Sequence, residues 1–128
     1  MNKEQLNINI FSNDAVFCTS LATECNKYGF NLTFYEESEI GSDKFIDDSL
    51  VSVNIIDLDS KEFDYCKIVQ KLRMTSNLPV FGVFNTFDKA LQAKAKKTGY
   101  DLVFTKSMLI KSVKNVIIHI SNENKEIK

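Results

Sequence analysis

Short apolar segments of strand length alternate with segments of helical character along the chain, and this alternation limits the fold more than any other feature. The strand-like segments are residues 6–11, 31–35, 51–56, 80–84 and 102–104. Between most of them, apolar residues recur every three or four positions, which is typical of a helix with one buried face. Strands joined by helices are predicted to lie parallel, with helices covering both faces of one sheet.

The ends of the predicted helices are marked by residues that commonly cap helices. Gly29 and Gly99 each follow a periodic segment, Asp88 precedes a basic one, and Ser107 is placed to cap the last helix. The acidic segment 36–49 is only weakly periodic and is predicted to form a short helix or a loop. The apolar positions of the three amphipathic helices are Phe17, Leu21, Cys25 and Tyr28, then Phe63, Cys66, Val69 and Leu72, then Leu109, Val113, Val116, Ile117 and Ile120.

Length and composition indicate one ordinary globular domain. The chain has 128 residues, of which 44% are hydrophobic and 26% charged, so it can bury a core of its own. We expect this domain to span residues 1–122 and a frayed polar tail to span residues 123–128. A net charge of −1 offers no basic surface for nucleic acid, and no apolar stretch approaches the length of a membrane span. The absence of a hydrophobic signal region and the three cysteines without a CxxC motif favour reduced core thiols and a cytoplasmic location.

Five strands with right-handed crossovers predict a flavodoxin-like α/β fold, a doubly wound parallel sheet in the order 2-1-3-4-5. In such sheets, ligands bind beyond the carboxyl ends of the strands, where the order reverses between the first and third strands. The polar residues that this topology brings to that edge are Ser12, Asn13, Asp14, Asp57, Asp59 and Lys106.

Several short motifs also occur in a characteristic order. They are Gly29-Phe30, Asp57-Leu58, Leu72-Arg73, Pro79-Val80-Phe81, Asp88 and the segment from Gly99 to Lys106. This ordered set resembles the response-regulator receiver family of bacterial two-component phosphorelays, and the resemblance covers residues 6–120. The resemblance implies that Asp57 stands at the phosphoacceptor position and that Lys106 contacts the phosphoryl group or the carboxylate.

The sequence departs from the family where the family binds Mg²⁺. The paired acidic residues after the first strand align with Ser12 and Asn13, and only Asp14 follows, one position late. Magnesium prefers near-octahedral oxygen ligation anchored on one or two carboxylates. A site made from Asp57, with help from Asp14 or Asp59, is therefore expected to bind Mg²⁺ weakly, and no other cofactor is expected.

The positions that the family uses as a conformational switch differ as well. The hydroxyl residue at the end of the fourth strand aligns with Phe84, and the aromatic residue of the fifth strand aligns with Val103. A phenylalanine cannot hydrogen-bond a phosphoryl oxygen. We therefore expect the family's readout of phosphorylation to be impaired.

These observations predict a stand-alone, receiver-like signalling domain that is not an enzyme. Its phosphorylation site is degraded and it acts through protein–protein contact, as a pseudo-receiver. One alternative is a phosphorylation-responsive regulator with Asp57 as acceptor. A second is a flavodoxin-like small-molecule binder or enzyme, although residues 12–16 contain no glycine for a flavin-phosphate loop.

The expected partner is a histidine kinase or a downstream signalling protein, and neither nucleic acid nor a membrane is expected. The face formed by the basic helix after Asp88, strand 102–104 and the last helix is the predicted docking surface. Its charged rim would include Lys89, Lys94 and Lys97, suited to an acidic partner. A homodimer is a further alternative.

Overall fold

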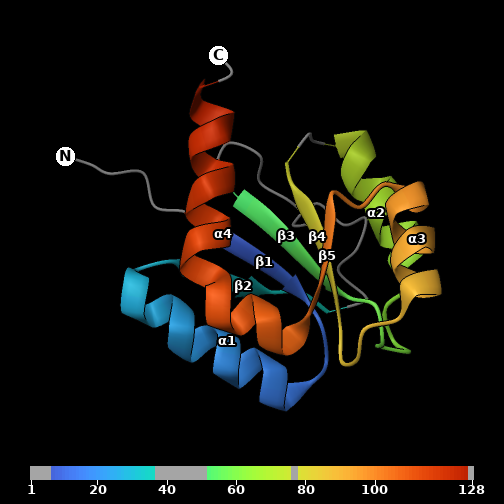
Figure 1. Cartoon of the computed structure of the whole chain (residues 1–128), viewed down its shortest axis with the longest axis horizontal. Coiled ribbons are helices and arrows are strands. Elements are labelled where there is room, and N and C mark those ends of the chain that lie inside the picture. The colour runs from blue at the N-terminus through green and yellow to red at the C-terminus, as the bar shows by residue number, and fades with distance from the viewer. Residues whose placement is uncertain (1–6, 37–51, 76–77, 127–128) are drawn as a thin grey trace.

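A five-stranded parallel sheet with helices on both faces forms the centre of the computed structural model (Figure 1), which describes residues 7–36, 52–75 and 78–126. The elements are β1 (Asn7–Phe11), α1 (Ala15–Tyr28), β2 (Asn31–Phe34), β3 (Ser52–Asp57), α2 (Tyr65–Thr75), β4 (Val80–Phe84), α3 (Lys89–Thr98), β5 (Leu102–Thr105) and α4 (Lys106–Glu126). The short helix or loop expected at residues 36–49 lies, apart from residue 36, outside the described residues.

The strand order is β2-β1-β3-β4-β5, and every neighbouring pair is parallel. This confirms the predicted doubly wound topology. The order reverses at β1, which pairs with β2 on one side and with β3 on the other. The carboxyl ends of β1 and β3 therefore lie side by side, and this edge is where the polar residues of the candidate site follow their strands.

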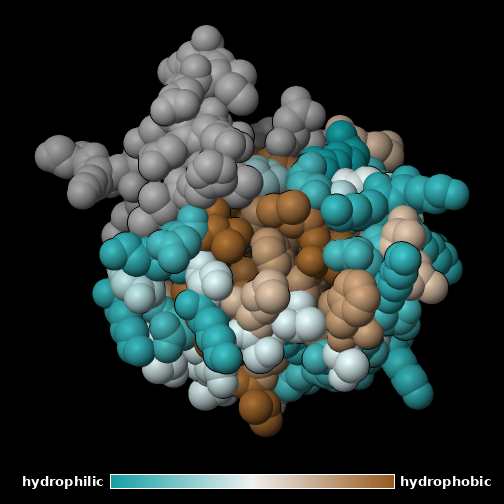
Figure 2. All heavy atoms as spheres, in the orientation of Figure 1, coloured by the Kyte–Doolittle hydropathy of each residue, from teal (hydrophilic) through white to brown (hydrophobic). Residues whose placement is uncertain are grey.

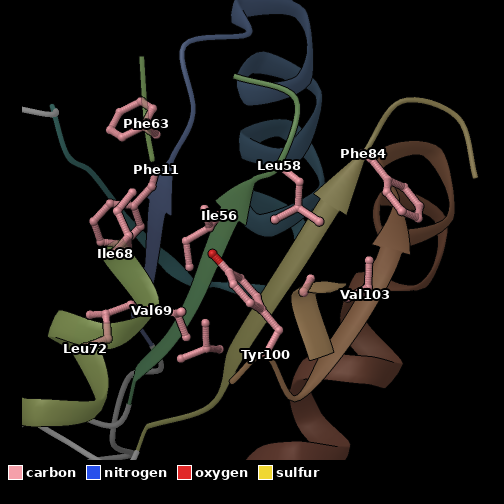
Figure 3. Close-up of a cluster of buried hydrophobic side chains, with 12 residues drawn as sticks. Phe11, Ile56, Leu58, Phe63, Ile68, Val69, Leu72, Phe84, Tyr100 and Val103 are labelled. Atoms are coloured by element: carbon pink, nitrogen blue, oxygen red, sulfur yellow. The ribbon is translucent and has the colours of Figure 1, made fainter. Parts of the chain in front are cut away.

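Alternate residues of the strands fill two cores, one on each face of the sheet. The core under α1 and α4 is formed by Ile8, Ile10, Phe17, Leu21, Cys25, Val53, Ile55, Phe81, Val83, Leu109 and Val113. The core under α2 and α3 (Figure 3) is formed by Phe11, Ile56, Leu58, Phe63, Ile68, Val69, Leu72, Val80, Phe84, Ala95, Tyr100 and Val103. Strands buried on both faces explain why the strand sequences are so apolar.

Helix α1 shows why its sequence begins and ends a helix where it does. The Asp14 carboxylate accepts a hydrogen bond from the Phe17 backbone N–H at 3.1 Å, and Gly29 closes the helix with φ of 76°. That left-handed conformation is favourable for glycine because it has no Cβ. Tyr28, expected on the buried face, is 41% exposed because it lies in the last turn, beyond the core.

Two other helices differ from the sequence-based expectation. Helix α2 begins at Tyr65, so Phe63 reaches the core from the preceding loop rather than from the helix. Helix α4 is capped by the Thr105 hydroxyl, which accepts from the Met108 N–H at 3.2 Å, and not by Ser107. Because Thr105 ends β5, the chain passes from strand to helix without a loop. The helix also continues through the polar tail to Glu126.

A line of buried amides crosses the sheet. Thr33 Oγ1 donates to Asn7 Oδ1, and Asn7 Nδ2 donates to Asn9 Oδ1. Asn9 Nδ2 in turn donates to Asn54 Oδ1 at 3.0 Å, and Asn54 Nδ2 donates to the Pro79 carbonyl at 3.3 Å. The chain of hydrogen bonds links β2, β1 and β3 to the start of β4, and it satisfies side chains that would otherwise be costly to bury.

Two further predictions concern the cysteines, expected to be reduced core thiols, and the lack of a membrane-spanning segment. Cys25 is buried in the core beside α1, and burial raises the pKa of its thiol to about 12, whereas Cys18 and Cys66 are half-buried. All three are free thiols. Within the described ranges, no helix combines the length and the apolar character needed to cross a membrane.

Candidate functional site

Three strand ends bring the candidate residues together at one edge of the sheet. Ser12 and Asp14 follow β1, Asp57 is the last residue of β3, and Lys106 is the first residue of α4, directly after β5. The side chains from these three junctions meet in one cluster of charges.

The Lys106 ammonium is shared between two carboxylates. Its Nζ lies 2.9 Å from Asp57 Oδ2 and 2.9 Å from Asp14 Oδ2. The side chains of Lys106 and Asp57 are only 9% and 2% exposed, whereas that of Asp14 is 31% exposed. The buried charges of Lys106 and Asp57 depend on each other for compensation, so removing either one is expected to be strongly destabilising.

The charges of the cluster shift the pKa of its members. The hydrogen bond from Lys106, followed by that from the Phe17 N–H, holds the pKa of Asp14 below its ordinary value. Burial acts to lower the pKa of Lys106, but hydrogen bonds and attraction from Asp14 and Asp57 outweigh it and raise that pKa. Both shifts favour the charged forms at neutral pH.

Both oxygens of Asp57 already accept hydrogen bonds. Oδ1 accepts from the Asp59 backbone N–H at 2.9 Å, and Oδ2 accepts from Ser12 Oγ at 2.7 Å in addition to its contact with Lys106. The carboxylate is therefore fixed in orientation by partners on three segments of the chain.

Ser12 and Asn13, predicted from the sequence to stand at the family's acidic-pair positions, hold the loops of the site together. Ser12 Oγ accepts from the Asp14 N–H at 3.1 Å while it donates to Asp57. Asn13 Oδ1 accepts from Ser60 Oγ at 3.0 Å, which ties the β1–α1 loop to the β3–α2 loop. These two neutral side chains thus connect the β1–α1 loop to Asp57 and to the β3–α2 loop.

The residues present do not fit Mg²⁺ as they are arranged. Asp14 and Asp57 meet around an ammonium, and Asp59 turns its Oδ2 to the Asn85 N–H at 2.6 Å. Among the residues whose positions are described, no three His, Cys, Asp or Glu side chains gather closely enough to hold a metal ion. Sequence reasoning placed Asp14 at the correct edge but missed its pairing with Lys106.

Placing an acidic pair at positions 12 and 13 is expected to create a magnesium site. The double variant Ser12→Asp/Asn13→Asp should bind Mg²⁺ at least about tenfold more tightly than the wild type, because it adds one carboxylate at the position that contacts Asp57 and a second on the adjoining loop. Isothermal titration with Mg²⁺ measures this gain. Thr19→Asp/Asn26→Asp adds the same charge on the exposed side of α1 and should change nothing. Tight binding by the wild type would contradict this expectation.

The two residues predicted at the switch positions, Phe84 and Val103, lie in the core under α2 and α3. Phe84 is 1% exposed, and its ring makes an edge contact with Phe87 at 6.1 Å between centroids. Figure 3 shows Phe84 at the end of β4, on the same side of the sheet as Val103. The neighbouring Phe104 points to the opposite core, where it packs on Phe81.

No family model matches the sequence, and no curated protein matches it. Solved structures do match, and those described below are response-regulator proteins. The receiver domain of NarL from Mycobacterium tuberculosis is 13% identical with a TM-score of 0.69, and the match covers 90% of this chain and 98% of that one.

Two further matches agree with it. A CheY-like receiver domain protein from Methanospirillum hungatei is 11% identical with a TM-score of 0.68, covering 94% of this chain and 99% of that one. Full-length FixJ from B. japonicum is 15% identical with a TM-score of 0.77, covering 94% of this chain and 60% of that one. At these identities the likeness shows the fold: this chain has the fold of a response-regulator receiver domain.

Proposed function

We propose that this chain is a receiver-like signalling domain of two-component type that acts through protein–protein contact and does not depend on phosphorylation. The observation that carries the proposal is the shared Lys106 ammonium, 2.9 Å from both Asp14 and Asp57. The receiver fold of the solved structures supports the signalling role.

Phosphoryl transfer to a carboxylate needs a free nucleophilic oxygen and a cation to neutralise the transferring group. In this site, Asp57 Oδ2 is engaged by Ser12 and Lys106, and the ammonium is already shared with a second carboxylate. Phe84 offers no hydroxyl to a phosphoryl oxygen, and its buried ring fills the core at the end of β4. A phosphoryl group would have few differential contacts through which to shift the conformation.

A small phosphodonor tests whether Asp57 can be phosphorylated. After incubation with acetyl phosphate and Mg²⁺, the intact mass of the wild type is expected to show no added phosphoryl group, because the nucleophile is engaged and the metal ligands are missing. The variant Asp57→Asn serves as the background control. Stoichiometric phosphorylation that is lost in Asp57→Asn would favour the phosphorylation-responsive alternative.

The proposed docking surface is the face formed by α3, β5 and α4. Figure 2 shows apolar side chains gathered between α4 and α3, where β5 runs along the edge of the sheet. Leu102, Phe104 and Ile110 are partly buried residues of these elements. Lys89, Lys94 and Lys97 of α3 are exposed and add positive charge at its rim. An apolar centre with a basic rim suits a partner with a complementary acidic border.

Charge reversal on α3 is expected to weaken capture of the partner. Removal of the Asp57 carboxylate is expected to leave capture unchanged. In pull-down assays with a histidine kinase or downstream signalling protein, Lys94→Glu/Lys97→Glu should reduce capture by about tenfold, since it reverses two rim charges. Asp57→Ala should capture as the wild type does if it remains folded, which circular dichroism checks. Lys61→Glu/Lys67→Glu reverses two exposed charges elsewhere and is the matched control. If Asp57→Ala abolishes capture while Lys94→Glu/Lys97→Glu leaves it unchanged, the proposal is wrong.

A further inference from the structure

We propose that the Lys106 ammonium is the resident cation of this site, that it excludes divalent metal ions, and that removing it leaves a divalent-cation site between Asp14 and Asp57. The proposal concerns the same cluster as the proposed function, but it holds whether or not a partner docks on the α3–β5–α4 face. It assigns to one side chain the bridging role that a metal ion would otherwise have.

The geometry places the ammonium where a metal ion would have to lie. Asp14 Oδ2 and Asp57 Oδ2 are both 2.9 Å from Lys106 Nζ. Divalent cations bind carboxylate oxygens at about 2.0–2.6 Å, so an ion at the same point would need each oxygen to move by less than about 1 Å. The two carboxylates are therefore already held within reach of a single small cation.

The ammonium is also held firmly in place. Its side chain is 9% exposed, and the Nζ lies 5.5 Å from the centre of the Phe17 ring, which adds a cation–π attraction. A divalent ion entering the wild-type site would have to displace this buried charge from two ion pairs or lie a few ångströms from it. Repulsion between like charges at that separation disfavours the second arrangement.

The carboxylates have anchors that do not depend on Lys106. Asp57 accepts from Ser12 Oγ and from the Asp59 N–H, and Asp14 accepts from the Phe17 N–H. The contact between Asn13 and Ser60 holds the two loops together. Without the ammonium, two like charges would remain at short range, and a divalent cation would relieve their repulsion.

The experiment compares Mn²⁺ binding, followed by electron paramagnetic resonance, in the wild type and three variants. Lys106→Met removes the ammonium and keeps the apolar length of the side chain. Lys106→Met/Asp14→Asn also removes one of the two proposed ligands. Lys94→Met removes an exposed charge of α3 and is the matched control. Thermal unfolding in EDTA or in millimolar Mn²⁺ provides a second readout.

Lys106→Met is expected to bind Mn²⁺ at least about tenfold more tightly than the wild type, because the repulsion by the ammonium is gone. Its melting temperature should rise when Mn²⁺ replaces EDTA, whereas those of the wild type and Lys94→Met should not. Asp14→Asn in the Lys106→Met background should abolish the gain. If Lys106→Met does not fold in either condition, Lys106→Gln takes its place with the same expected gain.

Two results would overturn the proposal: stoichiometric, tight Mn²⁺ binding by the wild type, or a folded Lys106 variant that gains no binding. Either is distinguishable from a failure of the proposed function. A wild type that excludes Mn²⁺ but is phosphorylated by acetyl phosphate would refute phosphate-independent signalling alone. A wild type that binds Mn²⁺ but accepts no phosphoryl group would refute the resident-cation proposal alone.

Discussion

Replacing Asn54 by alanine is expected to lower the free energy of unfolding by about 3 kcal/mol, because it combines a cavity with a lost hydrogen bond at a buried site. Asn54 is fully buried, at 0% exposure, and its Oδ1 accepts from Asn9 Nδ2 at 3.0 Å. Truncation leaves that Asn9 donor without its partner in the middle of the sheet. The Pro79 carbonyl loses one donor but keeps the Asn54 backbone N–H at 2.9 Å.

Chemical denaturation of a double-mutant cycle isolates the contribution of the amide pair. Asn9→Ala and Asn54→Ala should each be strongly destabilising, and the double variant should lose less than the sum of the two, since the second truncation removes a group that the first has already stranded. Asn115→Ala, at an exposed position of α4, is the matched control and should be close to neutral. Additive losses in the cycle would show that the two amides are not coupled.

The amide line also shows what the sequence pattern could not reveal. Residues 6–10 alternate apolar and polar, a pattern that is usual for a strand with one solvent-exposed face. In the structure, however, Asn7 and Asn9 are both buried, because their amides pair with each other and with Asn54. The apolar pattern was enough to predict the strand and its place in the sheet, but it cannot tell a solvated amide from one satisfied by a distant partner.

The candidate site, too, could be predicted from the sequence only in part. Topology alone could bring Asp14, Asp57 and Lys106 to one edge, because strand order and strand ends follow from the spacing of apolar segments. Which oxygen receives the ammonium depends on side-chain conformations and on caps. Asp14 caps helix α1 through one carboxylate oxygen, and its second oxygen pairs with Lys106. The sequence pattern predicts neither the ion pair between Asp14 and Lys106 nor the hydrogen bond that Asp59 accepts from the Asn85 N–H.

Replacing Lys106 by alanine is expected to destabilise the domain by about 3–5 kcal/mol near neutral pH, the usual cost of removing one partner from a buried ion pair. The Asp57 side chain is 2% exposed and would lose the cation that lies 2.9 Å from it. Asp14 would lose the same partner, and the two carboxylates would then repel each other. Chemical denaturation in EDTA measures the loss, and Lys94→Ala, at an exposed position, is the matched control.

The dependence of this loss on pH identifies its cause. The pKa of Asp14 is lowered in the folded wild type, first by its hydrogen bond from Lys106, so its contribution to stability is present above about pH 4 and is lost as the pH falls through the folded pKa. The pKa of Lys106 is raised, so its contribution is present below about pH 10 and is lost as the pH rises through the folded pKa. The difference in stability between wild type and Lys106→Ala should therefore be largest between these limits and shrink in acid, where protonation neutralises the stranded Asp14 carboxylate. An NMR titration should also show the pKa of Asp14 moving upward in the variant.

A loss of stability that is the same at pH values near 7 and below 4, with the pKa of Asp14 unchanged, would mean that Lys106 contributes through packing and not through its charge.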